Sequence, residues 1–147
     1  MDPMVNRHHT EAPGSISMGG TASLLTLTEK SGIGAVTGAI DGAAYGEPTS
    51  DLKQVGDGRV EYTMLHVFLD KDGSMLRTRD NAVLHTPTGD GHSTLEVEYT
   101  VVEATGKFTG YGGTFRSRGW VSMPEGERAF DQHTVGVVRF EGEIRRG

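Results

Sequence analysis

Short alternating segments separated by glycine-bearing turns are the feature that most constrains the fold of this 147-residue chain. No long stretch shows the 3.6-residue apolar period of a helix, and turn sequences such as KDG and TGDG separate the segments. The sequence therefore predicts an all-β fold, a single hollow antiparallel barrel of about seven or eight strands with little helix. The segments rich in Val, Thr, Leu, Tyr and Phe are 21–29, 33–40, 59–70, 73–85, 93–103, 113–123 and 134–144.

The length of the chain and its composition indicate one domain. A chain of 147 residues can enclose a single core or cavity but not two independent ones. Residues 1–20 are polar and rich in Gly, Pro and Ser, which predicts a flexible N-terminal arm. Residues 21–147 are predicted to form the barrel domain.

Charge and residue usage argue against several classes of partner. The net charge is -6 with both signs interspersed, and no run of Lys or Arg could neutralise successive phosphates, so no nucleic-acid partner is expected. The N-terminus has no apolar stretch like a signal peptide, and no run of about 18 apolar residues occurs, which predicts a cytoplasmic protein without a membrane partner. Cysteine is absent and the histidines lack metal-ligand spacing, so neither a metal nor another cofactor is expected.

Alternation within the segments predicts which side chains point inward. Residues 93–103 show the clearest pattern, in which Leu95, Val97, Tyr99 and Val101 share an apolar face. Glutamates and a threonine occupy most of the positions between them. The apolar face is therefore predicted to line the interior.

The segment 59–70 is largely apolar on both faces. Its two faces carry Val60, Tyr62, Met64, His66 and Phe68, and Glu61, Thr63, Leu65, Val67 and Leu69. A strand of this kind is usually covered twice, and in a single-layer barrel the second cover would be another subunit. The sequence thus predicts a homo-oligomer, a dimer or a trimer.

The segment 73–85 has two mixed faces, and either could line a wet cavity. One face carries Met75, Arg77, Arg79, Asn81, Val83 and His85, and the other carries Leu76, Thr78, Asp80, Ala82 and Leu84. If the first face points inward, Arg77 and Arg79 would bind a carboxylate or stabilise an enolate. If it points outward, the two arginines would form a surface ladder with Glu96 and Glu98.

The stretch between the fifth and sixth segments combines glycines with aromatic residues in the pattern T-G-x-F-x-G-x-x-G, which begins at Thr105 and ends at Gly113. Glycines so spaced allow positive φ and close backbone approach, so the chain can cross a barrel end with Phe108 tucked in as a plug. The stretch is either a structural corner, one rim of a cavity, or both.

This pattern resembles the glycine-rich segment of the allene oxide cyclase and dirigent-like β-barrels. The resemblance covers about residues 59–122. It implies an eight-stranded antiparallel barrel whose hollow interior binds a hydrophobic substrate and directs cyclisation or coupling without a metal or organic cofactor. It assigns no catalytic residue to this chain.

Polar groups predicted to face inward supply a candidate site. Tyr62, His66 and Tyr99 are predicted to be catalytic, because an imidazole can exchange a proton near neutral pH and phenols can hold an oxyanion. Buried histidines and tyrosines also occur as hydrogen-bonded core residues. The predicted substrate-binding residues are Arg77, Arg79, Phe68 and Phe108.

Two functions of different class follow. The first is a cofactor-independent isomerase, cyclase or lyase that acts on a small hydrophobic or aromatic substrate inside the barrel, in secondary or catabolic metabolism. The second is a non-catalytic, lipocalin-like barrel that binds a lipophilic ligand. The polar groups on the inward faces favour the enzyme, since a carrier needs few of them.

Overall fold

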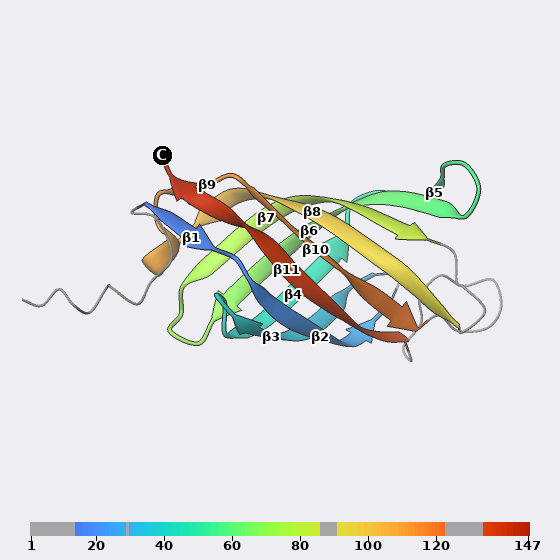
Figure 1. Cartoon of the computed structure of the whole chain (residues 1–147), viewed down its shortest axis with the longest axis horizontal. Helices are drawn as coiled ribbons and strands as arrows, with labels where there is room; N and C mark the ends of the chain where they lie inside the picture. The colour runs from blue at the N-terminus through green and yellow to red at the C-terminus, as the bar shows by residue number, and fades with distance from the viewer. Residues whose placement is uncertain (1–13, 29, 86–90, 123–133) are drawn as a thin grey trace, which may run out of the picture.

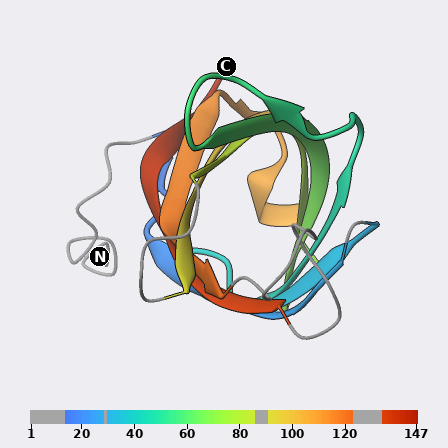
Figure 2. The same cartoon turned by 90° about the vertical axis from the view of Figure 1, so that its right-hand side faces the viewer.

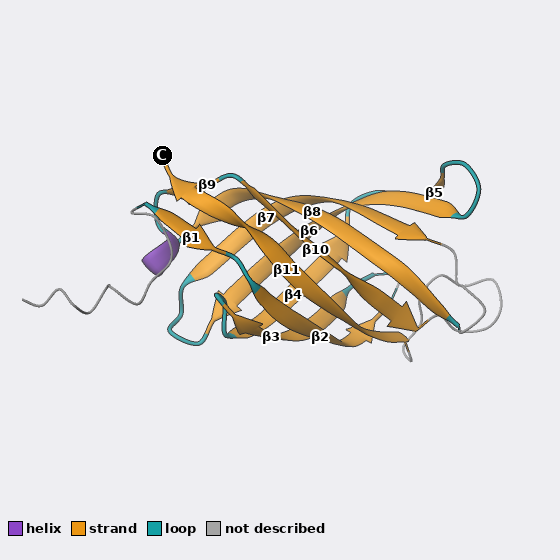
Figure 3. Cartoon of the chain, viewed as in Figure 1, coloured by secondary structure: helices purple, strands orange, loops and turns teal. Residues whose placement is uncertain are grey.

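Eight antiparallel strands close into a barrel in the computed structural model, which describes residues 14–28, 30–85, 91–122 and 134–147 (Figures 1 and 3). The eight strands are β2 (Gly20–Leu27), β3 (Gly32–Gly38), β4 (Gly42–Pro48), β6 (Arg59–Asp70), β7 (Met75–His85), β8 (His92–Ala104), β10 (Thr114–Ser122) and β11 (Thr134–Arg146). They are hydrogen-bonded in the order β11-β10-β8-β7-β6-β4-β3-β2, and β2 pairs back with β11. The predicted all-β barrel is therefore confirmed.

Four short elements accompany the barrel. They are β1 (Ser15–Ser17) and β9 (Tyr111–Gly112) on β11, β5 (Lys53–Gln54) on β6, and the 3₁₀ turn η2 (Gly106–Phe108). Figure 2, a view along the barrel, shows η2 inside the outline of the far end. Across the four described ranges, no helix is long and apolar enough to cross a bilayer.

The start of the folded region lies earlier than the sequence predicted. Ser15 pairs with Arg145 and Ser17 with Glu143, so β1 extends the sheet within the segment assigned to the arm. Met18, next along the chain, is buried. The boundary at residue 20 is therefore wrong, because three backbone pairs and a buried apolar side chain fix residues 15–18. The rest of the predicted arm, residues 1–13, lies outside the described residues.

Buried and exposed side chains alternate as predicted on β6 and β8, the two strands that contribute most to the site. On β8, Leu95, Val97 and Tyr99 are buried, with Glu98 and Thr100 exposed. On β6, Tyr62 and Phe68 are buried with His66 half-buried, on the same face. Eight strands carrying large inward side chains on β6 and β8 fill much of the barrel interior.

The glycine-rich stretch closes one end of the barrel. Gly106, Gly110 and Gly113 have φ of +60°, +87° and +112°. A Cβ on Gly106 would lie 2.2 Å from Ser74 Oγ, so a side chain there would clash as well as be strained. Phe108 is fully buried in the core, which confirms its predicted role as a plug.

Asp70 ties three elements together at this closed end. Its carboxylate accepts the backbone N–H of Asp41 at 2.9 Å and that of Asp72 at 3.1 Å, and Lys107 Nζ lies 3.2 Å from it. The side chain is buried. These amides, the Asp41 amide above all, and the lysine hold the pKa of Asp70 well below its usual range, because they stabilise the charged form.

Candidate functional site

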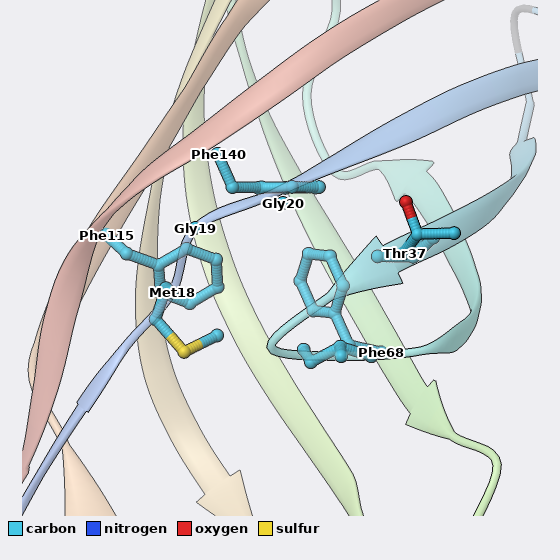
Figure 4. Close-up of a pocket in the computed structure, with 9 residues that line it drawn as sticks. Met18, Gly19, Gly20, Thr37, Phe68, Phe115 and Phe140 are labelled. Atoms are coloured by element: carbon cyan, nitrogen blue, oxygen red, sulfur yellow. The ribbon is translucent and has the colours of Figure 1, made fainter. Parts of the chain in front are cut away.

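An aromatic cluster divides the barrel interior into two spaces. The rings of Phe68, Tyr99, Phe115 and Phe140 lie with centroids 4.8 to 6.2 Å apart. On the side toward η2 lies a small apolar pocket, in which three phenylalanine rings of the cluster face Met18 (Figure 4). On the other side lies a larger cavity lined by β2, β3, β4, β6, β8, β10 and β11.

Small residues line the larger cavity on two neighbouring strands. They are Gly32 and Gly34 of β3 and Ala44 and Gly46 of β4. Larger residues line it from β6, which pairs with β4, and from β8 and β10 across the barrel. The cavity volume is about 50 Å³, which is room for roughly four water molecules.

His66 and Asp80 form a hydrogen-bonded pair at this cavity. His66 Nδ1 lies 2.5 Å from Asp80 Oδ2, and the exposed fractions of the two side chains are 15% and 0%. A carboxylate only accepts hydrogen bonds, so Nδ1 carries a proton and donates it to Asp80. The other ring nitrogen, Nε2, is then left to act on a ligand. The imidazole lines the cavity, whereas Asp80 lies behind it.

Gly46 provides the room for the imidazole. Gly46 is opposite His66 in the register of β4 and β6. A Cβ on Gly46 would lie 2.5 Å from Nε2 and within 2.9 Å of both ring carbons beside it, which is closer than real contacts allow. The absence of a side chain at this one position therefore determines where the imidazole lies.

Two tyrosines and a serine add hydroxyl groups to the cavity wall. Tyr99 Oη and Ser117 Oγ lie 2.7 Å apart, both on buried residues, and Tyr62 lines the same wall. Burial raises the pKa of Tyr62 and that of Tyr99 well above the usual value, because it disfavours the phenolate. Both phenols are therefore neutral hydrogen-bond donors near pH 7.

The three residues predicted to be catalytic come together, because Tyr62, His66 and Tyr99 all line this cavity. The ring centroids of His66 and Tyr99 are 5.3 Å apart in an edge-to-face arrangement. Three inward positions on two strands, placed by alternation alone, thus share one space.

The predicted substrate-binding arginines do not lie at the cavity. Arg77 and Arg79 are exposed on the outer face of β7, and Arg77 Nε lies 3.2 Å from Glu103 Oε1. The inward placement of both arginines is therefore wrong. The alternative, in which both arginines point outward, is correct. The partner of Arg77 is, however, Glu103 and not Glu96 or Glu98. Leu76, Thr78, Asp80, Ala82 and Leu84 form the inward face, and all five are buried.

The two predicted substrate-binding phenylalanines lie apart from the cavity that holds His66. Phe68 lines the smaller pocket on the other side of the aromatic cluster (Figure 4), although its ring stacks on His66 at 5.5 Å. Phe108, the last residue of η2, is fully buried at the closed end, with Lys107 Nζ 5.3 Å from the centroid of its ring. Neither is among the described residues that line the larger cavity.

Sequence reasoning missed Asp80, Ser117 and Gly46 as members of the site. Asp80 sits at an inward position between apolar neighbours, and a carboxylate in such a position is a signal that could have been used. Ser117 and Gly46 give no such signal, because small residues are common at the inward positions of many strands. Only the strand register brings these three residues beside His66 and Tyr99.

No cluster of His, Asp or Glu suited to holding a metal ion occurs within the residues that the structure describes. No protein-family model matches the sequence, and neither a curated protein nor a solved structure matches it significantly. The site must therefore be interpreted from its own geometry.

Proposed function

We propose that the protein is a cofactor-independent enzyme, an isomerase, cyclase or lyase, that moves a proton on a small hydrophobic substrate held in the barrel cavity. The observation that carries the proposal is the contact of His66 Nδ1 with the buried carboxylate of Asp80, which leaves Nε2 as a base in a mostly apolar cavity. A carrier of lipophilic ligands has no need of such a pair.

The proposed chemistry is proton abstraction from a carbon next to a carbonyl group. The C–H bond breaks, the proton goes to His66 Nε2, and the electron pair moves to the carbonyl oxygen, which becomes an enolate. Asp80 stabilises the imidazolium that forms, and a neutral hydroxyl donates a hydrogen bond to the enolate oxygen. Return of the proton to another carbon gives an isomer, and loss or attack of a neighbouring group gives elimination or ring closure.

The resemblance to the allene oxide cyclase and dirigent-like barrels is consistent with this class of reaction. That family acts on hydrophobic substrates inside a barrel without a cofactor. The resembling stretch, 105–113, which contains Phe108, lies at the closed end and not at the cavity. It therefore supports the architecture, while His66 and Asp80 support the chemistry.

Hydrogen–deuterium exchange of a small ketone tests the proposal. Cyclopentanone in D₂O is incubated with the protein, and loss of its α-hydrogens is followed by proton NMR. His66→Gln should lower the protein-catalysed rate by about a hundredfold or more, the usual contribution of a general base. Asp80→Asn should also lower the rate, because an amide can hold the imidazole in the wrong tautomer.

His85→Gln is the matched control, since His85 points outward near Glu96 on the same barrel. This variant should exchange the ketone at the wild-type rate. All rates are compared per folded molecule, with the folded fraction taken from urea unfolding curves. Exchange that survives in His66→Gln would refute the proposed base. Ketone binding without exchange would instead favour the lipocalin-like carrier.

A further inference from the structure

Within the described residues, no Lys or Arg at the cavity could balance an anionic ligand. Every Lys and Arg among the described residues is exposed, and none lines the cavity. The fully buried carboxylate of Asp80, by contrast, lies directly behind His66. A carboxylate or phosphate entering this space would lose its hydration without gaining a counter-ion, and would meet a like charge.

The wall of the cavity holds one hydroxyl hydrogen that the protein does not use. Tyr99 and Ser117 together carry two O–H groups, and a single hydrogen bond joins their oxygens. Whichever group donates in that bond, the hydrogen of the other remains for a further acceptor. No such acceptor exists in the part of the chain that the structure describes. Both residues are more than nine-tenths buried, so a ligand oxygen or a water must take that hydrogen.

The wall formed by β3 and β4 carries no polar side chain. Gly32, Gly34, Gly46 and Ala44 line the cavity there. The positions that side chains on the three glycines would take are already filled, by Leu27, by Ser23 and Leu24, and by His66. The polar groups lie on the neighbouring strand β6 and, across the barrel, on β8 and β10.

We propose that the ligand of this cavity is a small, neutral compound with a carbonyl oxygen, and that its anionic relatives are excluded. The carbonyl oxygen accepts the unused hydrogen of the Tyr99–Ser117 pair. The choice of a carbonyl compound rests on the proposed function, but the inference concerns binding and not turnover. A neutral ligand takes the place of the acidic substrate that inward-pointing Arg77 and Arg79 would have bound.

Three ligands with the same five-membered ring test the proposal by NMR titration. Cyclopentanone carries the carbonyl, methylenecyclopentane keeps its shape without an acceptor, and cyclopentanecarboxylate carries a negative charge. The ketone should bind about tenfold more tightly than the alkene, which is the value of one hydrogen bond of about 1.4 kcal/mol. The ketone should also bind at least tenfold more tightly than the carboxylate.

Filling the cavity separates binding inside the barrel from binding elsewhere. Ala44→Leu adds volume where Ala44 lines the cavity and should abolish ketone binding. Ala43→Leu, one residue earlier on the same strand, points outward and should bind the ketone like the wild type. If Ala44→Leu does not fold by circular dichroism, the smaller Ala44→Val takes its place and should weaken binding.

Each outcome decides the inference. The inference is supported if the wild type prefers the ketone and if ketone binding is lost in Ala44→Leu or weakened in Ala44→Val. Equal or tighter binding of the carboxylate or of the alkene overturns it, as does an absence of ketone binding or binding that the Ala44 variants leave unchanged. A ketone that binds as expected but exchanges no hydrogen would refute the proposed enzyme and leave the ligand assignment intact.

Discussion

At the scale of single residues, the site depends on what Gly46 lacks. The imidazole of His66 occupies the volume that a Cβ at Gly46 would need, with Nε2 at 2.5 Å from that position. The backbone of Gly46 has no positive φ, so an alanine there would not be strained by its own conformation. The clash with the imidazole is thus the main consequence of adding a methyl group.

We predict that Gly46→Ala displaces His66 while the barrel remains folded. The imidazole proton resonances should shift, and ketone exchange should fall by about tenfold or more, since small displacements of a base are costly. Gly112→Ala is the control, because a Cβ at Gly112 meets no atom within 4 Å and its φ is not positive. Unchanged imidazole resonances in Gly46→Ala would contradict the assigned ring position.

Alternation correctly placed Tyr62, His66 and Tyr99 on inward faces. On their strands, the residues two positions away on the same face are apolar, and this identifies the face that points inward. It could not orient Arg77 or Arg79, because both faces of their strand contain polar groups. Orientation there is decided by Leu76 and Leu84, whose burial outweighs that of Met75 and Val83 on the other face. The pairing of Asp80 with His66 could not be predicted, because it depends on the register between two strands.

At the scale of elements, β4 is the one of the eight barrel strands that the sequence did not predict. Its inward positions, Gly42, Ala44 and Gly46, are small, so they lack the apolar signal that marks the other strands. One of these small residues, Gly46, leaves the room that the imidazole of His66 fills. The feature that concealed the strand is therefore the one that positions the imidazole.

The contacts of Asp70 with the amides of Asp41 and Asp72 and with Lys107 predict that the stability of the fold depends on pH. Because the folded-state pKa of Asp70 lies below the unfolded value of about 3.9, its carboxylate stabilises the fold above about pH 4. This contribution is lost as the pH falls through the folded-state pKa. Asp70→Asn should therefore lower the free energy of unfolding at pH 7 by about 1.5–3 kcal/mol.

Urea unfolding at several pH values measures this effect. The difference between wild type and Asp70→Asn should shrink as the pH is lowered below about 4, because the wild-type carboxylate becomes protonated. Asp57→Asn, on an exposed turn, should track the wild type at every pH. A difference that stays constant down to the lowest pH at which the protein folds would rule out the charged carboxylate as the cause.

At the scale of the whole molecule, one outer face of the barrel is apolar. Ile33, Tyr45, Leu65 and Leu69 lie on neighbouring strands β3, β4 and β6, with exposed fractions from 39% to 50%. Ile33 pairs with Tyr45, and Tyr45 pairs with Val67 in turn. Monomers rarely expose a contiguous apolar patch of this kind.

We predict that this face joins copies of the chain into a homo-oligomer. Light scattering at micromolar concentration should give a dimer or trimer mass, and the double variant Leu65→Glu, Leu69→Glu should give the 15.8 kDa monomer. Val102→Glu, on an exposed position of β8, should leave the mass unchanged. A monomer mass for the wild type would remove the inference and leave the cavity untouched.

The barrel is closed by the pairing of β2 with β11, whose residues lie more than a hundred positions apart in the chain. Val138 of β11 and Leu24 and Leu27 of β2 line the larger cavity from these two neighbouring strands. The ligand space therefore has no precursor in any local hairpin, since its walls meet only after this long-range contact forms. During synthesis on the ribosome, we therefore expect the cavity to close only once residues 134–140 have emerged.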